Sequence, residues 1–176
     1  VMLSTYVTNP KEVAFYVVAL RTGMLVSIFG ASIAMIFRPR VAESFGNNDM
    51  ERLKSDYHIT TRWIIFLSIP FLITFFVLPS EILSVFGAQF TEANRILQLI
   101  VIGVFAEVIF GLNTVIMVLS GKRRIIIIIS LIGVSLNVLM NYLMIPRWGA
   151  VGAALATILT YALSRTLTMI FVYREF

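Results

Sequence analysis

The chain has 176 residues, of which 59% are hydrophobic and only 13% are charged, and its mean hydropathy is +0.94. Soluble domains carry roughly 25% charged residues, so this composition excludes an ordinary soluble domain and predicts an all-α, polytopic membrane protein. The absence of cysteine excludes disulfides and thiol chemistry. The net charge of +5 does not indicate a nucleic-acid partner, because the basic residues cluster at the ends of apolar segments, as in membrane proteins generally.

Five apolar segments are long enough to cross a hydrocarbon core of roughly 30 Å. In chain order we expect spans at about residues 13–37, 63–78, 93–119, 125–145 and 150–172. Pro70 lies inside the second span and predicts a kink there. The start "VML" has no charged region of a signal peptide, so we interpret residues 1–9 as the end of a preceding helix and the chain as a piece of a longer protein.

The connection between the first two expected spans, residues 38–62, is the one long polar loop. Within it, Asn48 followed by Glu51 predicts the start of a short amphipathic helix on the membrane surface. Residues 79–90 predict a short interfacial helix that ends at Gly87, with Thr91 as the next N-cap.

The stretch "IPRWGAVGAALAT" joins the last two expected spans. Pro146 is predicted to end one span and Gly149 to turn the chain. The small residues that follow favour close packing of the last helix against its neighbours, since lipid provides no hydrophobic drive for helices to associate.

The basic residues predict the orientation. If five spans alternate, nine basic residues lie on one side and three on the other; the three are Lys11, Arg95 and Arg147. Cytoplasmic loops carry the excess of Lys and Arg. We therefore expect a multi-pass protein of the cytoplasmic membrane, with residues 38–62 and the C-terminus in the cytoplasm.

Three charged residues lie inside the expected spans: Arg21, Glu107 and Arg165. Each costs about 2.5–3.5 kcal/mol to insert, so each needs a partner or a function. Glu107 and Arg165 lie at similar depths, and they form either a structural ion pair or part of a cavity wall. Arg21 belongs to no clear polar stripe.

Three expected spans each carry one polar or small-residue stripe, which predicts a shared hydrophilic interior. Glu107 and Arg165 belong to two of them, and Asn137 and Asn141 to the third. Asn137 and Asn141 are candidates for the cavity wall, but the sequence favours hydrogen bonds between helices as their role. The stripe members besides these four are Gly103, Gly111 and Thr114; Thr157, Tyr161, Ser164 and Thr168; and Ser130 and Gly133.

Motifs of enzymes are not found in the sequence. It has no phosphate-binding loop, no metal-ligand spacing and no acidic loop that could hold a sugar nucleotide. We therefore expect no enzyme activity, no cofactor and no metal. Many helices with short connections and polar interiors are typical of a transporter.

Several segments in order resemble the C-terminal half of the Wzx-type polysaccharide or O-antigen flippases. These include "FYVVALRTGMLVSIFGASIAMIF", "RLKSDYHITTRW", "LPSEILSVFGAQF", "MVLSGKRR" and, most specifically, "NVLMNYLMIPRWGAVGAALAT". The flippases belong to a superfamily that also contains the lipid II flippase and the multidrug and toxin extrusion antiporters. The resemblance covers essentially the whole chain.

The resemblance implies that residues 1–176 are a partial C-terminal lobe of a two-lobe transporter. Its partners would be the N-terminal lobe, the lipid bilayer and a polyprenyl-diphosphate-linked oligosaccharide, flipped by alternating access for the synthesis of cell-surface polysaccharide such as lipopolysaccharide O-antigen. Basic cavity residues of the family are thought to hold the diphosphate, which would make Arg21 and Arg165 its ligands here. H⁺ or Na⁺ would be the coupling ion.

Three alternatives remain open at this point. A cation-coupled multidrug antiporter of the same superfamily would favour acidic over basic cavity residues. A relative without transport could serve envelope or spore-coat assembly. A membrane glycosyltransferase would need a soluble domain with an acidic site outside this chain.

Overall fold

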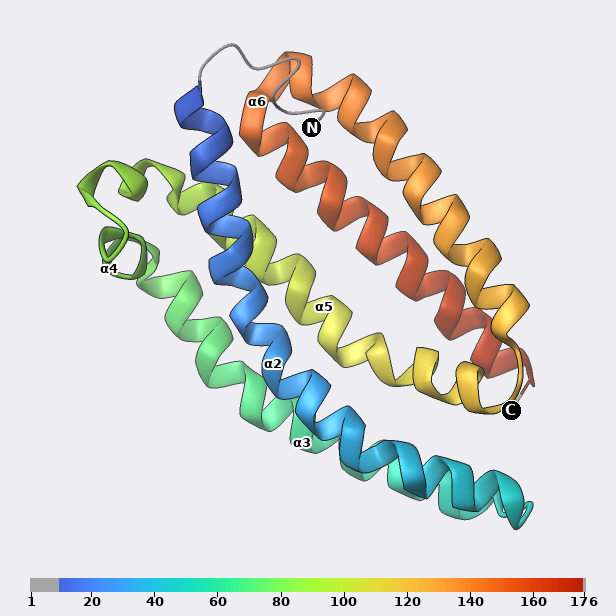
Figure 1. The fold of residues 1–176 in the computed structure, drawn as a ribbon. Helices are drawn as coiled ribbons and strands as arrows, with labels where there is room; N and C mark the ends of the chain where they lie inside the picture. Colours follow the sequence, from blue (N-terminus) through green and yellow to red (C-terminus); the bar gives the residue numbers. More distant parts are fainter. Residues whose placement is uncertain (1–9, 176) are drawn as a thin grey trace.

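The computed structural model describes residues 10–175, which form helices and short turns without a strand. In chain order these are α2 (Pro10–Gly46), α3 (Met50–Val77), α4 (Pro79–Ser84), the 3₁₀-helix η1 (Ala88–Ala93), α5 (Asn94–Leu119) and α6 (Arg123–Glu175) (Figure 1). By length and composition, four helices can cross a membrane: α2, α3, α5 together with η1, and α6. The expected all-α polytopic bundle is confirmed. The helix expected at residues 1–9 lies outside the described residues.

Helix α6 reverses direction at Gly149 and forms an antiparallel hairpin (Figure 1). Gly149 has φ 53° and ψ −132°, a conformation that essentially only glycine adopts without strain. The predicted turn at Gly149 is therefore confirmed, although the helix runs past Pro146 before it turns. The two halves, residues 123–148 and 150–175, contain the segments expected to span at 125–145 and 150–172.

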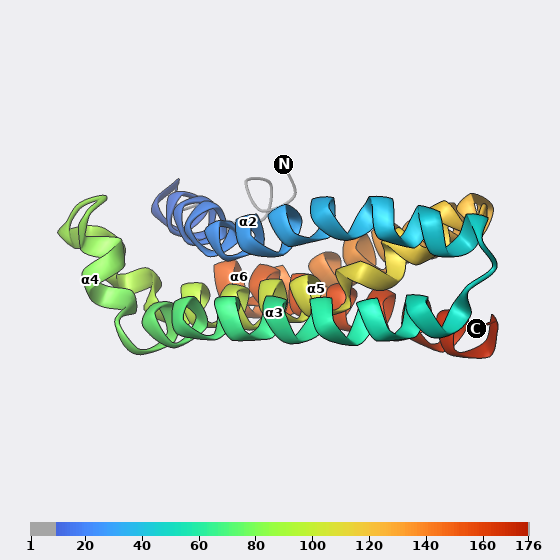
Figure 2. The ribbon, with the colours of Figure 1, turned by 90° about the horizontal axis from the view of Figure 1, so that it is seen from below.

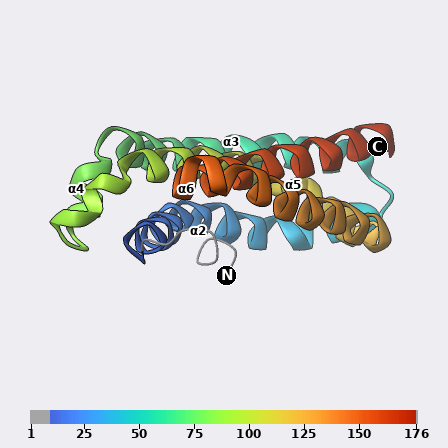
Figure 3. The same cartoon turned by 90° about the horizontal axis from the view of Figure 1, so that it is seen from above.

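Helix α5 lies at the centre of the bundle and packs against α2, α3 and α6. Figure 3 shows α2 and the first half of α6 towards one face, and α3 and the second half of α6 towards the other. Buried side chains occur on all sides of α5, among them Leu97, Val101, Leu112 and Met117. A helix that is apolar all round is expected to be enclosed by others.

The polar segment 38–62 is not a loop, and the prediction of a separate surface helix was wrong. Helix α2 continues through Pro39 to Gly46, and α3 starts at Met50, so the two form a long helical hairpin (Figure 2). With 37 residues, α2 is about 55 Å long, well beyond a hydrocarbon core of roughly 30 Å.

Contacts between α2 and α3 explain why this polar segment stays helical. Phe37, Val41 and Leu53 are buried in the common core. Arg52 donates two hydrogen bonds to the Glu43 carboxylate, at 2.9 and 3.1 Å, and Arg40 lies 3.4 Å from Asp56. The hydrophobic pattern within either helix could not predict this hairpin, because each helix is stabilised by side chains of the other.

The predicted N-caps were one and two residues off. The N-cap of α3 is Asp49, whose carboxylate accepts a 2.9 Å hydrogen bond from the Arg52 amide, while Asn48 turns the chain with φ 57°. Thr91 is not an N-cap. It lies within η1, where its hydroxyl donates to the Ala88 carbonyl at 2.8 Å, and α5 starts at Asn94.

Asp49→Ala in the full-length protein is expected to lower the free energy of unfolding by about 1 kcal/mol, because the change leaves an amide of the first turn of α3 unsatisfied. Denaturant unfolding followed by circular dichroism measures this loss. The control is Asn47→Ala in the same turn, which removes an exposed side chain that does not cap the N-terminus of α3. Equal effects of the two changes would contradict the capping role.

A polar cavity between α2, α5 and α6

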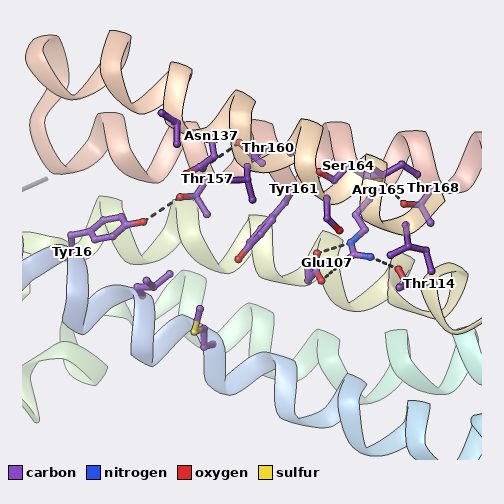
Figure 4. A pocket seen from close by; sticks show the side chains of 18 residues that line it. Tyr16, Glu107, Thr114, Asn137, Thr157, Thr160, Tyr161, Ser164, Arg165 and Thr168 are labelled. Atoms are coloured by element: carbon purple, nitrogen blue, oxygen red, sulfur yellow. Dashed lines mark hydrogen bonds and ion pairs between the residues drawn. The ribbon is translucent and has the colours of Figure 1, made fainter. Parts of the chain in front are cut away.

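A cavity of about 460 Å³ lies between the N-terminal part of α2, the middle of α5 and both halves of α6 (Figure 4). Glu107 and Thr114 enter it from α5, and Asn137, Tyr161 and Arg165 from the two halves of α6. The three polar stripes expected from the sequence therefore line one space. The antiparallel reversal at Gly149 makes this possible, because it brings residues 129–138 and 157–168 to the same level of the bundle.

The two charged residues of the cavity form an ion pair. Arg165 Nε donates to Glu107 Oε2 at 2.6 Å, and Nη2 donates to Glu107 Oε1, so the contact is bidentate (Figure 4). Nη1 donates to the Thr114 hydroxyl at 2.6 Å. The side chains of Arg165 and Glu107 are 19% and 31% exposed, so both still reach the cavity. The sequence left open whether Glu107 and Arg165 form an ion pair or line a cavity. In the structure they do both.

The asparagines of α6 form hydrogen bonds within the bundle. Asn137 Nδ2 donates to the Thr160 hydroxyl on the other half of α6 at 3.2 Å, and it lines the cavity. Asn141 Nδ2 donates to Oδ1 and to the backbone oxygen of Asn137 at 2.8 and 2.9 Å. Asn137 therefore joins the two halves of α6 by a hydrogen bond and also lines the cavity. Asn141 does not line the cavity, but it holds Asn137 in place by hydrogen bonds.

Sequence reasoning missed Tyr16 and Thr160. The Tyr16 hydroxyl and Thr157 Oγ1 are 3.2 Å apart and form a hydrogen bond between α2 and α6 (Figure 4). Tyr16 starts the line of cavity residues on α2, followed at four-residue spacing by Leu20 and Met24. That spacing was readable in the sequence, but Leu20 and Met24 are apolar, so no polar stripe marked it.

Arg21 lies apart from this cluster. Its side chain is exposed, and it directly follows Leu20 of the cavity wall. Within residues 10–175, Arg21 has no hydrogen bond or ion pair. Of the three charged residues expected inside the spans, Arg21 is the one whose charge stays uncompensated in this part of the chain.

The chemistry of the cavity follows from these contacts. The charges of Glu107 and Arg165 cancel, and the remaining polar groups are hydroxyls and amides, which bind neutral polar ligands by hydrogen bonds. Among the described residues no three His, Asp or Glu side chains gather as metal ligands.

Comparison with known proteins agrees with this architecture. The family model MatE matches residues 1–143, which include α2 to α5 and most of the first half of α6. The chain belongs to the MatE family. Members of the MatE family are transporters, and the long apolar helices of this chain indicate a multi-pass membrane protein.

Two curated relatives match most of this MatE chain. The probable low-salt glycan biosynthesis flippase Agl15 of Haloferax volcanii is 28% identical over 161 residues, which are 89% of this chain and 34% of the relative. The uncharacterized membrane protein MJ1068 of Methanocaldococcus jannaschii is 26% identical over 159 residues, 89% of this chain and 31% of the relative. The chain thus spans about a third of the length of these relatives. No solved structure shows significant similarity.

Proposed function

We propose that the protein containing this chain flips a polyprenyl-diphosphate-linked oligosaccharide across the cytoplasmic membrane, with residues 1–176 as part of its C-terminal lobe. The polar cavity inside the bundle carries this proposal, since a hydrophilic interior in a membrane protein serves a polar substrate. The name of the Haloferax volcanii relative, a probable low-salt glycan biosynthesis flippase, supports the same substrate class.

The charges favour this substrate over a cationic drug. The carboxylate of the cavity, Glu107, is already neutralised by Arg165. The uncompensated charge in the middle of a span is the cation of Arg21, on the exposed face of α2. A lone cation is costly against lipid, so this face of α2 turns towards the other lobe and the transport pathway, where it meets an anionic group. A diphosphate satisfies it with charge-assisted hydrogen bonds.

The two parts of the substrate thereby meet different residues. The diphosphate lies on Arg21, and the neutral sugar hydroxyls face Asn137, Tyr161 and the paired Arg165 and Glu107. Tyr161 offers an aromatic body with a polar tip, which suits a sugar ring. Lobe motion then exposes the site alternately to the two sides, with H⁺ or Na⁺ as the driving ion and the C-terminus in the cytoplasm.

Arg21→Gln in the full-length protein is expected to lower the flipping rate of a lipid-linked oligosaccharide in proteoliposomes by about ten-fold or more, because a charge-assisted hydrogen bond to the diphosphate is lost. Arg21→Lys keeps the charge and should retain an intermediate rate. The matched control is Arg95→Gln, which removes an exposed cation near the start of α5.

Two results would overturn the proposal. One is an Arg21→Gln protein that flips the substrate as fast as the Arg95→Gln control. The other is a wild-type protein that leaves the lipid-linked oligosaccharide in place but exchanges cationic drugs for H⁺ or Na⁺, which would establish the multidrug antiporter.

A further inference from the structure

A second hollow lies on the opposite side of α5 from the Glu107–Arg165 cavity. It has a volume of about 460 Å³ and is bounded by the start of α3, the end of α5 and the end of α6. Helices α3 and α6 both pack on α5 and scarcely touch each other, so α5 forms the floor of the groove between them. Asn113 and Ile116 of α5 face this groove, whereas Glu107 and Thr114 face the other cavity.

The groove is mainly apolar at its base, where Asn113 is a buried polar side chain, and it is positively charged at its rim. Leu53 and Ile116 are buried, and Met169 and Val172 of α6 extend this apolar surface. Lys54 and His58 are exposed, one helical turn apart on α3. No acidic side chain within residues 10–175 pairs with Lys54. A ligand that matches both the apolar base and the cationic rim of the groove has an apolar body and an anionic head.

The position along the bundle also suits such an amphiphile. Lys54 lies in the first turns of α3 and Tyr173 in the last turn of α6, at the end of the bundle where the α5–α6 turn carries three consecutive basic residues, 122–124. Tyr57 and Tyr173 border the groove, and tyrosines concentrate where spans leave the hydrocarbon core. Basic side chains at this level meet lipid headgroups.

We propose that this groove binds an anionic phospholipid of the surrounding membrane. The lipid phosphate lies on the Lys54 ammonium and the His58 imidazole, and the upper part of an acyl chain lies against Ile116, Met169 and Val172. The lipid then fills the space between α3 and α6 and holds both helices against α5. This site is independent of the transported substrate, so the two proposals can fail separately.

The test measures lipid binding to the purified full-length protein by native mass spectrometry. Phosphatidylglycerol is compared with phosphatidylcholine of the same acyl chains, and free glycerol phosphate serves as the headgroup without a lipid. We expect one tightly retained phosphatidylglycerol, weaker phosphatidylcholine binding and no competition by glycerol phosphate. Lys54→Gln should weaken phosphatidylglycerol binding by about five-fold, the effect typical of one basic residue at a lipid surface.

Two further variants separate the groove from general surface charge. Arg38→Gln removes an exposed cation of α2 from outside the groove and should leave the retained lipid in place. Met169→Trp fills the groove without changing charge and should displace the lipid. Because Lys54 and Met169 are exposed, neither change should prevent folding.

Three results would overturn the proposal: equal retention of the two phospholipids, equal effects of Lys54→Gln and Arg38→Gln, or full competition by glycerol phosphate, which would indicate a site for a free anion. Absence of any retained lipid in the wild-type protein would also overturn it. In that case the groove is covered by another part of the full-length chain.

Discussion

Arg165→Gln in the full-length protein is expected to lower the free energy of unfolding by about 2–4 kcal/mol, because it leaves the Glu107 carboxylate inside the bundle without its cation. Arg165 donates three hydrogen bonds, two of them to Glu107 and one to Thr114. Both charged side chains keep some exposure to the cavity, which holds the loss below the upper limit for a fully buried pair. Denaturant unfolding of the purified protein in detergent measures it.

Two double variants test whether the loss comes from the stranded charge. Glu107→Gln with Arg165→Gln leaves no charge unpaired and should recover at least part of the stability. Exchange of the two residues, Glu107→Arg with Arg165→Glu, should restore both stability and transport if the pair is structural. If Arg165→Gln unfolds like the wild type and yet abolishes transport, Arg165 binds the substrate directly and the structural role is wrong.

Gly149→Ala is expected to lower the free energy of unfolding by about 2–4 kcal/mol, since a residue with a side chain at this φ and ψ costs about 1–3 kcal/mol and the new methyl group also meets the Glu12 carboxylate. The turn at Gly149 sets the alignment of the two halves of α6. The bonds from Asn137 to Thr160 and from Tyr16 to Thr157 depend on that alignment. Transport should therefore fall together with stability.

Gly111→Ala is the matched control for Gly149→Ala. Gly111 is in regular α-helix, and a methyl group there would meet no atom within 4 Å. This change should be neutral or stabilise the protein by up to about 1 kcal/mol, through the higher helix propensity of alanine. Adding Glu12→Ala to Gly149→Ala removes the steric contact but not the backbone strain, so it should restore only part of the stability. Equal stability of the Gly149→Ala and Gly111→Ala proteins would contradict the account of the turn.

Much of the architecture could be predicted from local features of the sequence. Long apolar segments predict helices because a bilayer leaves the backbone no other partners for its polar groups. Gly149 predicted the reversal within α6, because the residue needed there must accept a positive φ. The stripes through Glu107, Asn137 and Arg165 predicted a polar interior, because helical periodicity places such residues on one face.

Other features depended on residues distant in sequence. The segment 38–62 read as a polar loop, since its helical state rests on contacts across the hairpin, chiefly the burial of Phe37, Val41 and Leu53. Tyr16 is a wall residue because Thr157 lies opposite it, 141 positions along the chain. The rotation of each helix about its axis decides such pairs, and periodicity leaves that rotation undetermined.

The sequence by itself therefore determined that this protein is a helical membrane protein, where its apolar segments lie and which residues are too polar for lipid. Only the tertiary structure decided that Glu107 and Arg165 neutralise each other while Arg21 has no partner within residues 10–175. The physical reason is that the cost of a charge in a membrane is local to one helix, whereas its compensation comes from whichever helix packs against it.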